Sequence, residues 1–484
     1  MRRYPSPLLV ALVVLVACST GAERASPPMT APASPASAPT EATTTSSTVP
    51  SPLPLAGPQA ASATCPAVPA QAAPDPDRPT YTMSVRLDLD DNAVEGRLTV
   101  RFRPDVATDR LVFRLWPNGP RPRAAGARLE AGPVFLGASV PVPTEAPDPT
   151  TLVVPLEAPL AAGDVIEATV PWRLTLPGAS NDRLARHGDA VRLGSFFPIL
   201  AWEPGVGWAT DPPTSAFAEA TTTPVADFSY SVAVPDGLTV LASGVRDGAR
   251  WRAPAARDVA ISIGRFRTAE ALTSTTPPVA VTVGVHEGID DDPQTYLDRV
   301  VAAFEDFSGR FGPLPYRSYT LAVTPGLSGG IEYPGHVMQG PGTLGRTLSH
   351  EVGHMWFYAL VGNNQGTDPW LDEGLATWAE ARFEGTLDDV VARSIPAAGR
   401  NHVGEPMTFW ENNQSAYFRS VYVQGAQALA ALGDPDAVDC ALRLYAATHA
   451  FTIARPDDLF AALRQIFPDA DATLAAFGAT FTGH

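Results

Sequence analysis

The chain contains no lysine, so all 34 of its basic residues are arginine, and they stand against 51 aspartates and glutamates. The formal net charge is therefore −17, and so large a negative charge argues against a nucleic-acid partner. Cysteine is scarce as well: the three cysteines are Cys18, Cys65 and Cys440, and the spacing of the last two is not that of a metal site. The sequence leaves open whether these two form a disulfide.

A long hydrophobic run is also missing, because no segment stays apolar for the length that a membrane-spanning helix needs. The shorter run from Leu8 to Ala17 follows Arg2 and Arg3, as in an export signal, and is followed directly by Cys18. The end of this run resembles the bacterial lipobox, a signal in which the cysteine becomes the lipidated first residue of the mature protein. We therefore expect a signal peptide over residues 1–17 and an exported protein that is lipid-anchored to the cell membrane through Cys18. An ordinary secretory signal with an incidental cysteine is the alternative.

The chain of 484 residues is too long for one compact core, so we expect two folded domains behind any tail. Residues 18–77 consist mainly of proline, alanine, serine and threonine, with little charge and few aromatic residues. Such a composition buries too little apolar surface to fold, and it predicts a disordered tether over this range.

Alternation of apolar and polar residues then begins. The segments from Tyr81 to Leu89 and from Val94 to Phe102 flank the turn-like Asp90-Asp91-Asn92, which is typical of a β-hairpin, and a similar segment runs from Phe228 to Val234. Short strands with regular turn signals predict an antiparallel β-sandwich domain over residues 78–270. From residue 271 to 484 the periodicity becomes mainly helical, starting with a helix that Asp292 caps and Pro293 opens.

His350, Glu351 and His354 form the pattern H-E-x-x-H. Residues four apart on a helix share a face, so both imidazoles can reach one metal ion, and Glu351 can accept a proton from a metal-bound water. A catalytic zinc needs one more protein ligand, and Glu373 falls inside a second predicted helix, which Asp368 and Pro369 open. Two histidines on a helix face without a metal are the alternative for the short pattern alone.

The whole run from His350 to Glu380, with Trp356 and Trp370-Leu371, resembles the gluzincins and in particular the aminopeptidase N family of zinc metallopeptidases (peptidase family M-one). The resemblance covers about residues 80–450 and implies a β-sandwich followed by a thermolysin-like, mainly α-helical catalytic domain. It also implies one zinc ion held by His350, His354 and Glu373, with Glu351 as the general base and peptides as substrates. The large C-terminal helical domain of many members is expected to be absent.

Two further segments resemble motifs of this family. Gly329-Gly330-Ile331-Glu332-Tyr333 is similar to Gly-x-Met-Glu-Asn, which implies that Glu332 binds the free α-amine of a peptide and that Gly329 and Gly330 line the substrate site, although tyrosine replaces asparagine at position 333. The segment from Tyr422 to Gly425 is similar to Tyr-x-Lys-Gly, which implies that Tyr422 hydrogen-bonds the oxyanion. Tyr417 is a nearby competitor for that role.

Other interpretations remain in view. Gly326, Ser328 and Gly330 match the serine-hydrolase pattern G-x-S-x-G, but that motif needs a helix after the serine, and the residues that follow read as extended chain. Within the metallopeptidase hypothesis, an endopeptidase with an open cleft is the alternative to an aminopeptidase. A non-catalytic surface binding protein on the same scaffold is the third possibility. The sequence leaves side-chain specificity and oligomeric state open.

Overall fold

The computed structural model describes residues 53–62, 65–137, 140–216 and 222–480. The chain falls into two units, Met1–Pro50 and Ser51–His484, and every described residue belongs to the second. The predicted signal peptide, the lipidation site Cys18 and the first part of the tether lie outside the described residues. Among the residues that are described, no helix has both the length and the apolar character to cross a membrane.

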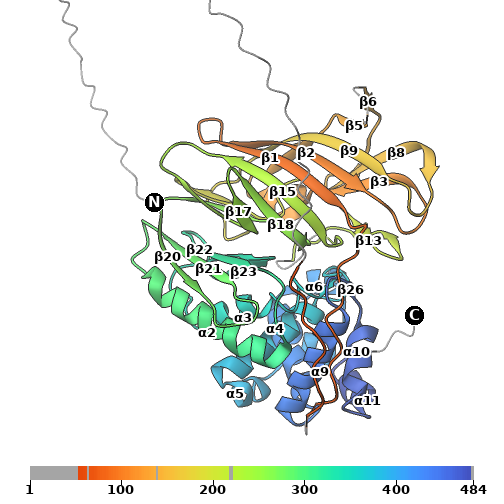
Figure 1. Cartoon of the computed structure of the whole chain (residues 1–484), viewed down its shortest axis with the longest axis vertical. Coiled ribbons are helices and arrows are strands. Elements are labelled where there is room, and N and C mark those ends of the chain that lie inside the picture. Colours follow the sequence, from red (N-terminus) through yellow and green to blue (C-terminus); the bar gives the residue numbers. More distant parts are fainter. Residues whose placement is uncertain (1–52, 63–64, 138–139, 217–221, 481–484) are drawn as a thin grey trace, which may run out of the picture. The chain divides into compact units, whose positions relative to one another are not determined.

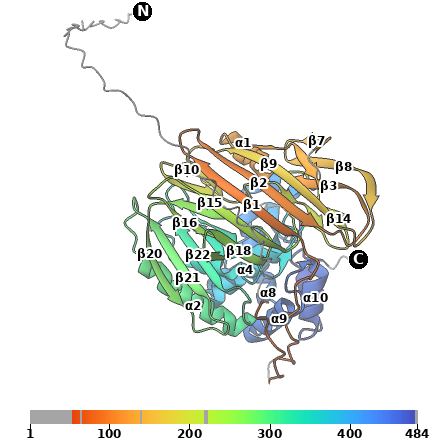
Figure 2. The same ribbon diagram turned by 45° about the horizontal axis from the view of Figure 1, so that its top comes forward.

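The first folded region is built from β-sheets, and the largest of them runs through the whole region (Figure 2). Strand β1 (Thr80–Asp88) buries every second residue, as its alternating sequence predicts. The order of strands in this sheet is β17 (Val245–Asp247), β18 (Arg250–Ala256), β15 (Ala226–Ala233), β1, β2 (Ala93–Phe102), β9 (Ile166–Thr175), β5 (Val134–Leu136) and β6 (Pro141–Val142), with β4 (Arg128–Ala131) also paired to β9.

Smaller sheets complete this region and share one hydrophobic core with the large sheet. One contains β10 (Leu184–His187), β11 (Ala190–Leu193), β19 (Ile261–Gly264) and β16 (Thr239–Ala242). Another contains β12 (Ile199–Leu200), β3 (Thr108–Arg114), β8 (Thr151–Leu160) and β7 (Glu145–Asp148), and β13 (Trp202–Glu203) pairs with β14 (Gly207–Trp208). The expectation of a purely antiparallel arrangement is wrong at one place, because β1 and β15 run parallel. A parallel pair needs a long connection between its strands, and these two strands are distant in sequence.

The second region begins with a five-stranded sheet in the order β20 (Phe266–Leu272), β21 (Ala280–His286), β22 (Ser318–Val323), β24 (His336–Gln339) and β23 (Gly330–Tyr333). Strand β20 pairs with β21 along its entire length, from Phe266 opposite His286 to Leu272 opposite Ala280. The expected boundary at residue 270 therefore falls inside a strand, and the second region starts at about Phe266.

Helix α2 (Pro293–Phe311) lies along this sheet (Figure 1), and the Asp292 side chain accepts a hydrogen bond from the Gln294 amide, as the cap signal predicts. The other helices are α3 (Arg346–Gly353), α4 (Trp370–Glu384), α5 (Leu387–Val391), α6 (Met407–Glu411), α7 (Gln414–Tyr417), a π-helix over Phe418–Val423, α8 (Gln424–Ala430), α9 (Pro435–Thr448), α10 (Pro456–Arg464) and α11 (Ala470–Ala475). A short α1 (Pro120–Ala124) lies in the first region, and β25 (Gly362–Asn363) pairs with β26 (Ile453–Ala454).

Buried polar contacts join the two regions. The Arg257 guanidinium donates to the carbonyl oxygens of Tyr358 at 2.8 Å and Thr452 at 2.6 Å. The hydroxyls of Tyr333 and Ser195 lie 3.1 Å apart. Because buried hydrogen-bonding groups are costly to separate, these contacts hold the β-sheet region against the helical one.

The tether prediction is wrong for its described part, residues 53–62 and 65–77. Cys65 forms a disulfide with Cys440 of α9, with the two Cα atoms 5.6 Å apart. Val68 is buried, and the amide of Ala72 donates to the carbonyl of Ala447 at 2.8 Å. This segment therefore packs on the helical region, because a covalent bond and main-chain hydrogen bonds supply what its composition does not.

Candidate metal centre

Two short helices carry the predicted metal ligands. His350 and Glu351 lie in α3, His354 follows as its C-terminal cap, and Glu373 lies in the first turn of α4. The two helices cross closely at Gly353, where a Cβ atom would come 3.3 Å from the Cβ of Ala379. The small residues at this crossing bring the first turn of α4 next to the face of α3 that carries the histidines.

The boundaries of these helices differ from the sequence prediction. Helix α3 ends at Gly353, so His354 of the H-E-x-x-H pattern is its C-cap and not an internal helical residue. Pro369 is the N-cap of α4 and makes no side-chain cap bond, while the Asp368 carboxylate accepts a hydrogen bond from the Thr367 hydroxyl. The predicted capping by Asp368 is therefore wrong, although the position of Glu373 in the helix is as expected.

The three predicted ligands converge. Nε2 of His350 lies 3.1 Å from Nε2 of His354 and 3.1 Å from Oε2 of Glu373, and the His354 nitrogen lies 3.4 Å from the same oxygen. All three side chains are buried. Two nitrogen atoms and one carboxylate oxygen that face one point form the ligand set of a catalytic zinc, with a fourth position left for water or substrate.

The surroundings of the histidines fit a cation. Nδ1 of His354 donates to the carbonyl of Phe357 at 3.0 Å, which leaves Nε2 to face the cluster. Nδ1 of His350 lies 3.4 Å from Oε2 of Glu380, and the other oxygen of this carboxylate, Oε1, pairs with Arg346. Burial lowers the pKa of His350, but the bonds to Glu373 and Glu380 outweigh burial and raise this pKa well above its usual value. The cluster therefore favours positive charge, as a metal site does.

Glu351 lies beside the cluster with one carboxylate oxygen unpaired. Its Oε2 is buried, and no hydrogen-bond partner for it exists within the described residues. Burial raises the pKa of this carboxyl to about 8. Gly330 of β23 lies directly against it, since a Cβ atom at that position would come 2.3 Å from Cγ of Glu351. The carboxylate of Glu351 is thus held between its helix and the edge strand.

The two candidate tyrosines differ in their contacts. The Tyr422 hydroxyl donates to Oε1 of Glu373 at 2.6 Å, and its ring is stacked on His350 with centroids 5.5 Å apart. Tyr417 is buried, and its ring centroid lies 5.8 Å from that of Tyr422. Both line the cavity, and Tyr422 contacts a predicted metal ligand directly.

Glu332 and Tyr333 of β23 point in different directions. Glu332 is buried at the cavity, and its carboxylate groups with Glu351 and His354, with the polar atoms of the three within 4.8 Å of one another. The Tyr333 ring packs so tightly against Gly194 that a Cβ atom there would come 2.3 Å from its hydroxyl. Tyrosine at position 333 therefore fills the boundary between the two regions and takes no part in lining the cavity.

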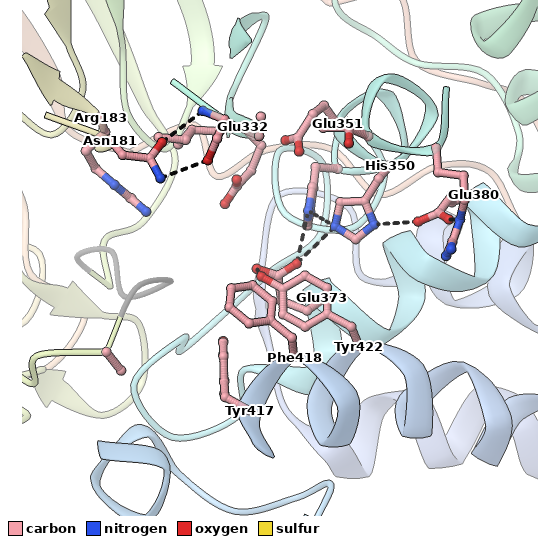
Figure 3. A pocket seen from close by; sticks show the side chains of 18 of the residues that line it. Asn181, Arg183, Glu332, His350, Glu351, Glu373, Glu380, Tyr417, Phe418 and Tyr422 are labelled. Atoms are coloured by element: carbon pink, nitrogen blue, oxygen red, sulfur yellow. Dashed lines mark hydrogen bonds and ion pairs between the residues drawn. The ribbon is translucent and has the colours of Figure 1, made fainter. Parts of the chain in front are cut away.

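These residues surround one cavity of about 710 Å³ (Figure 3). The predicted residues Gly329, Gly330 and Glu332 form one side of it, and the metal cluster and Tyr422 form another. Sequence reasoning missed Arg183 and Asn181, which enter from the first region, and it missed Glu380 and Arg346. Glu380 lies two turns after Glu373 on one helix, and this spacing predicts that both side chains project from the same face of the helix.

The serine of the G-x-S-x-G pattern has a structural role. Asn181 donates from Nδ2 to Oγ of Ser328 at 2.9 Å and accepts from the Ser328 amide at 2.9 Å. The residues that follow form strand β23, so the helix that a serine-hydrolase elbow requires is absent at this described position. Asn181 thereby joins the loop before β10 to the edge of the cavity.

Comparisons with known proteins bear on this site. No protein-family model matches the chain. A leukotriene A-4 hydrolase from Xenopus laevis is 28% identical over 204 residues, which make up 37% of this chain and 32% of that protein. A membrane alanyl aminopeptidase from Manduca sexta is 28% identical over 215 residues, 39% of this chain and 20% of that one. A probable M1 family aminopeptidase from Encephalitozoon cuniculi is 32% identical over 85 residues, 18% of this chain and 9% of that one. The chain thus spans about a third or less of the length of these curated relatives.

Solved structures match over more of the chain. An M1 zinc metallopeptidase from Deinococcus radiodurans is 18% identical, with a TM-score of 0.59, and the match covers 84% of this chain and 95% of that one. A variant of the M1 zinc metallopeptidase from the same organism, bound to a Tyr-Ser-Ala substrate, gives a TM-score of 0.61 at 19% identity, again over 84% and 95%. The resemblance drawn from the motifs is thereby confirmed: this chain has the fold of the M1 zinc metallopeptidases, and its relatives in sequence include an M1 family aminopeptidase.

Proposed function

We propose that this protein is a zinc-dependent metallopeptidase that removes N-terminal residues from peptides. The observation that carries the proposal is the convergence of His350, His354 and Glu373 on one point, with the unpaired carboxylate of Glu351 beside them. One zinc ion per chain fits this ligand set, and the M1 neighbours in sequence and structure support that choice of metal.

In the proposed mechanism, zinc, when bound, polarises the scissile carbonyl and acidifies water. Glu351 accepts a proton from that water and passes it to the leaving amine, a role for which its buried Oε2, without a hydrogen-bond partner among the described residues, is available. Glu373 would hold the metal, and its carboxylate is itself oriented by the Tyr422 hydroxyl. When substrate is bound, that hydroxyl turns to the oxyanion and donates to it.

Glu332 favours an aminopeptidase over an endopeptidase. A buried carboxylate at the cavity wall is a partner for the ammonium group of a free N-terminus, and charge-assisted bonds of this kind are the stronger ones. The Tyr-Ser-Ala substrate named for the solved neighbour has the length of a short peptide. An endopeptidase that accepts chains without a free amine is the second candidate, because tyrosine replaces the family's asparagine at position 333.

The architecture belongs to the same proposal. The shared core of the sheets in the first region supports a β-sandwich, and the five-stranded sheet followed by α2, α3 and α4 supports a thermolysin-like catalytic domain.

We also propose that the protein is exported and lipid-anchored through Cys18, on the sequence argument alone. Replacement Cys18→Ser should release the protein from the membrane fraction or block its processing, and unchanged membrane association would contradict the anchor.

The test is hydrolysis of matched peptides with free and acetylated N-termini by zinc-loaded protein, with chelated protein as the blank. Cleavage of the free peptide, with single amino acids released from the N-terminus, supports an aminopeptidase. Equal cleavage of both peptides at internal bonds supports the endopeptidase. Zinc binding without any cleavage would support a non-catalytic binding protein.

A further inference from the structure

Arg183 is a buried cation at the wall of the cavity that the proposed mechanism does not use. It lies directly before β10, and only 2% of its surface is exposed. Its guanidinium group lies over the ring of Trp116, 5.0 Å from the centroid, and 6.0 Å from that of Tyr333. These two rings fix the position of the guanidinium before any ligand binds.

Among the described residues, the Arg183 guanidinium has an ion pair with Asp182 that is too long for a hydrogen bond. Its Nε is buried and has no hydrogen-bond partner in the described part of the chain. The nearest recorded carboxylate oxygen, Oδ1 of Asp182, lies 3.9 Å from Nε and already accepts the Arg183 amide at 2.7 Å. The other oxygen of Asp182 lies 3.4 Å from Nε of Arg121, so this carboxylate is shared. Burial lowers the pKa of this guanidinium, but Tyr333, Glu332 and Asp182 outweigh burial and raise it, so the charge is favoured from a distance. An incoming carboxylate would add the direct hydrogen bond that Nε lacks in the described part of the chain.

The position of Arg183 tells which part of a substrate can reach it. In Figure 3 it lies on the side of Glu332 that faces away from Glu351 and the histidines. The scissile carbonyl belongs at the metal cluster and the α-amine at Glu332. A group that reaches past Glu332 to Arg183 therefore belongs to the residue on the amino side of the scissile bond, and it is the side chain of the N-terminal residue.

We propose that Arg183 binds a carboxylate of the substrate and makes the enzyme selective for peptides that begin with glutamate or aspartate. Glu332 and Arg183 then form a pair of opposite charges that receives the ammonium and the side-chain carboxylate of one residue. A short peptide that binds in the reverse direction would bring its C-terminal carboxylate to the same place, and this carboxylate is the other source of the same chemistry. This inference rests on the proposed aminopeptidase function.

A purely structural role for Arg183 is the competing explanation, in which the guanidinium only packs between Trp116 and Tyr333. That role needs the flat apolar contact but not the charge. Replacement Arg183→Met keeps a long side chain between the rings and removes the charge, whereas Arg183→Lys keeps a charge without the planar group. Arg186→Met removes a charge three residues away that bonds to Leu89 and Asn92 and lies outside the cavity, and it serves as the matched control.

The experiment compares kcat/KM for p-nitroanilides of glutamate and glutamine, and for Ala-Ala-Ala with a free or an amidated C-terminus. We expect wild type to prefer glutamate and Arg183→Met to reduce the glutamate-to-glutamine ratio by about 10- to 100-fold, as the loss of a charge-assisted contact does. Arg183→Lys should give an intermediate ratio, and Arg186→Met should keep the wild-type ratio. A change only in the ratio of free to amidated peptide would support carboxylate binding with the C-terminus as the source.

Equal ratios in wild type and Arg183→Met for both pairs would overturn the inference while leaving the aminopeptidase intact. If no substrate is cleaved, the proposed aminopeptidase function fails, and a measurement of peptide binding then tests the role of Arg183 by itself. In that case isothermal titration of zinc-loaded protein with Glu-Ala-Ala and Gln-Ala-Ala should show tighter binding of the acidic peptide, and Arg183→Met should abolish the difference. Equal binding of the two peptides by wild type would overturn the inference.

Discussion

Gly330 and Glu351 are in such close contact that no side chain fits between them: a Cβ atom on the glycine would lie 2.3 Å from Cγ and 2.4 Å from Oε1 of the glutamate. The edge strand of the sheet therefore sets the position of the proposed general base. A displacement of about 1 Å at a reacting group can reduce the rate by about a hundredfold.

Replacement Gly330→Ala should consequently lower kcat by about 10- to 100-fold, because the new methyl group displaces the Glu351 carboxylate. Zinc content should stay near that of wild type, since His350, His354 and Glu373 do not contact Gly330 in this way. Steady-state kinetics and metal analysis measure both quantities. Gly309→Ala in α2, where a Cβ atom meets nothing within 4 Å, is the control and should behave as wild type. Full activity of Gly330→Ala would show that the base is not held by this contact.

Tyr422 should be the tyrosine that matters for turnover. Tyr422→Phe should lower kcat by about a hundredfold or more with a modest change in KM, because a hydrogen bond to the oxyanion acts in the transition state. The bond from Tyr422 to Glu373 adds a second measurable effect, a weaker affinity for zinc of about 10-fold or more. Tyr417→Phe is the matched comparison. A large loss in Tyr417→Phe with normal kinetics in Tyr422→Phe would reverse the assignment.

Glu332 should strengthen the binding of peptides that have a free N-terminus. In Glu332→Ala, KM for peptides with a free amine should rise by about 10-fold or more, since a charge-assisted contact in a buried site is lost. KM for acetylated peptides should change far less, because they carry no ammonium group. Inhibition by the same peptides provides an independent measure of affinity. A parallel loss for both kinds of peptide would argue against amine recognition.

The disulfide between Cys65 and Cys440 should stabilise the fold, since it joins a segment of low hydrophobicity to α9 across a sequence separation of 375 residues. Replacement of both cysteines by serine should lower the free energy of unfolding by about 2–4 kcal/mol, measured by urea denaturation. Limited proteolysis should then cut before residue 78, where wild type is protected. Either single replacement should match the double one, and equal stability of all forms would show that the packed segment holds without the bond.

The sequence contains enough to predict the metal ligands but not the surroundings that position them. His350, His354 and Glu373 follow from a spacing rule, because a helix repeats every 3.6 residues and a second helix supplies the third ligand. The crossing that brings the helices together depends on Gly353 and Ala379, and no local pattern marks that pair. Arg183 lies far from the motif in sequence, so only the folded chain shows that it lines the cavity.

The fold shows the same difference between local patterns, which the sequence reveals, and contacts between distant segments, which it does not. The hairpin of β1 and β2 is local and was predictable from alternation and a turn, whereas the parallel pairing of β1 with β15 joins distant segments and leaves no local signal. The segment around Cys65 and Val68 has the composition of a spacer, so composition predicts disorder. A disulfide and a few main-chain bonds override that prediction, because they do not depend on a run of apolar residues.

The most direct test of the metallopeptidase account is a comparison of wild type with Glu351→Gln, both assayed for bound zinc and for release of N-terminal residues from a free-amine peptide. The replacement removes the proton acceptor but leaves His350, His354 and Glu373 in place. The account predicts about one zinc per chain in both proteins. It also predicts loss of nearly all activity in the variant, by a factor of about a thousand or more. Turnover of Glu351→Gln at the rate of wild type, or wild type that binds no zinc, would contradict it.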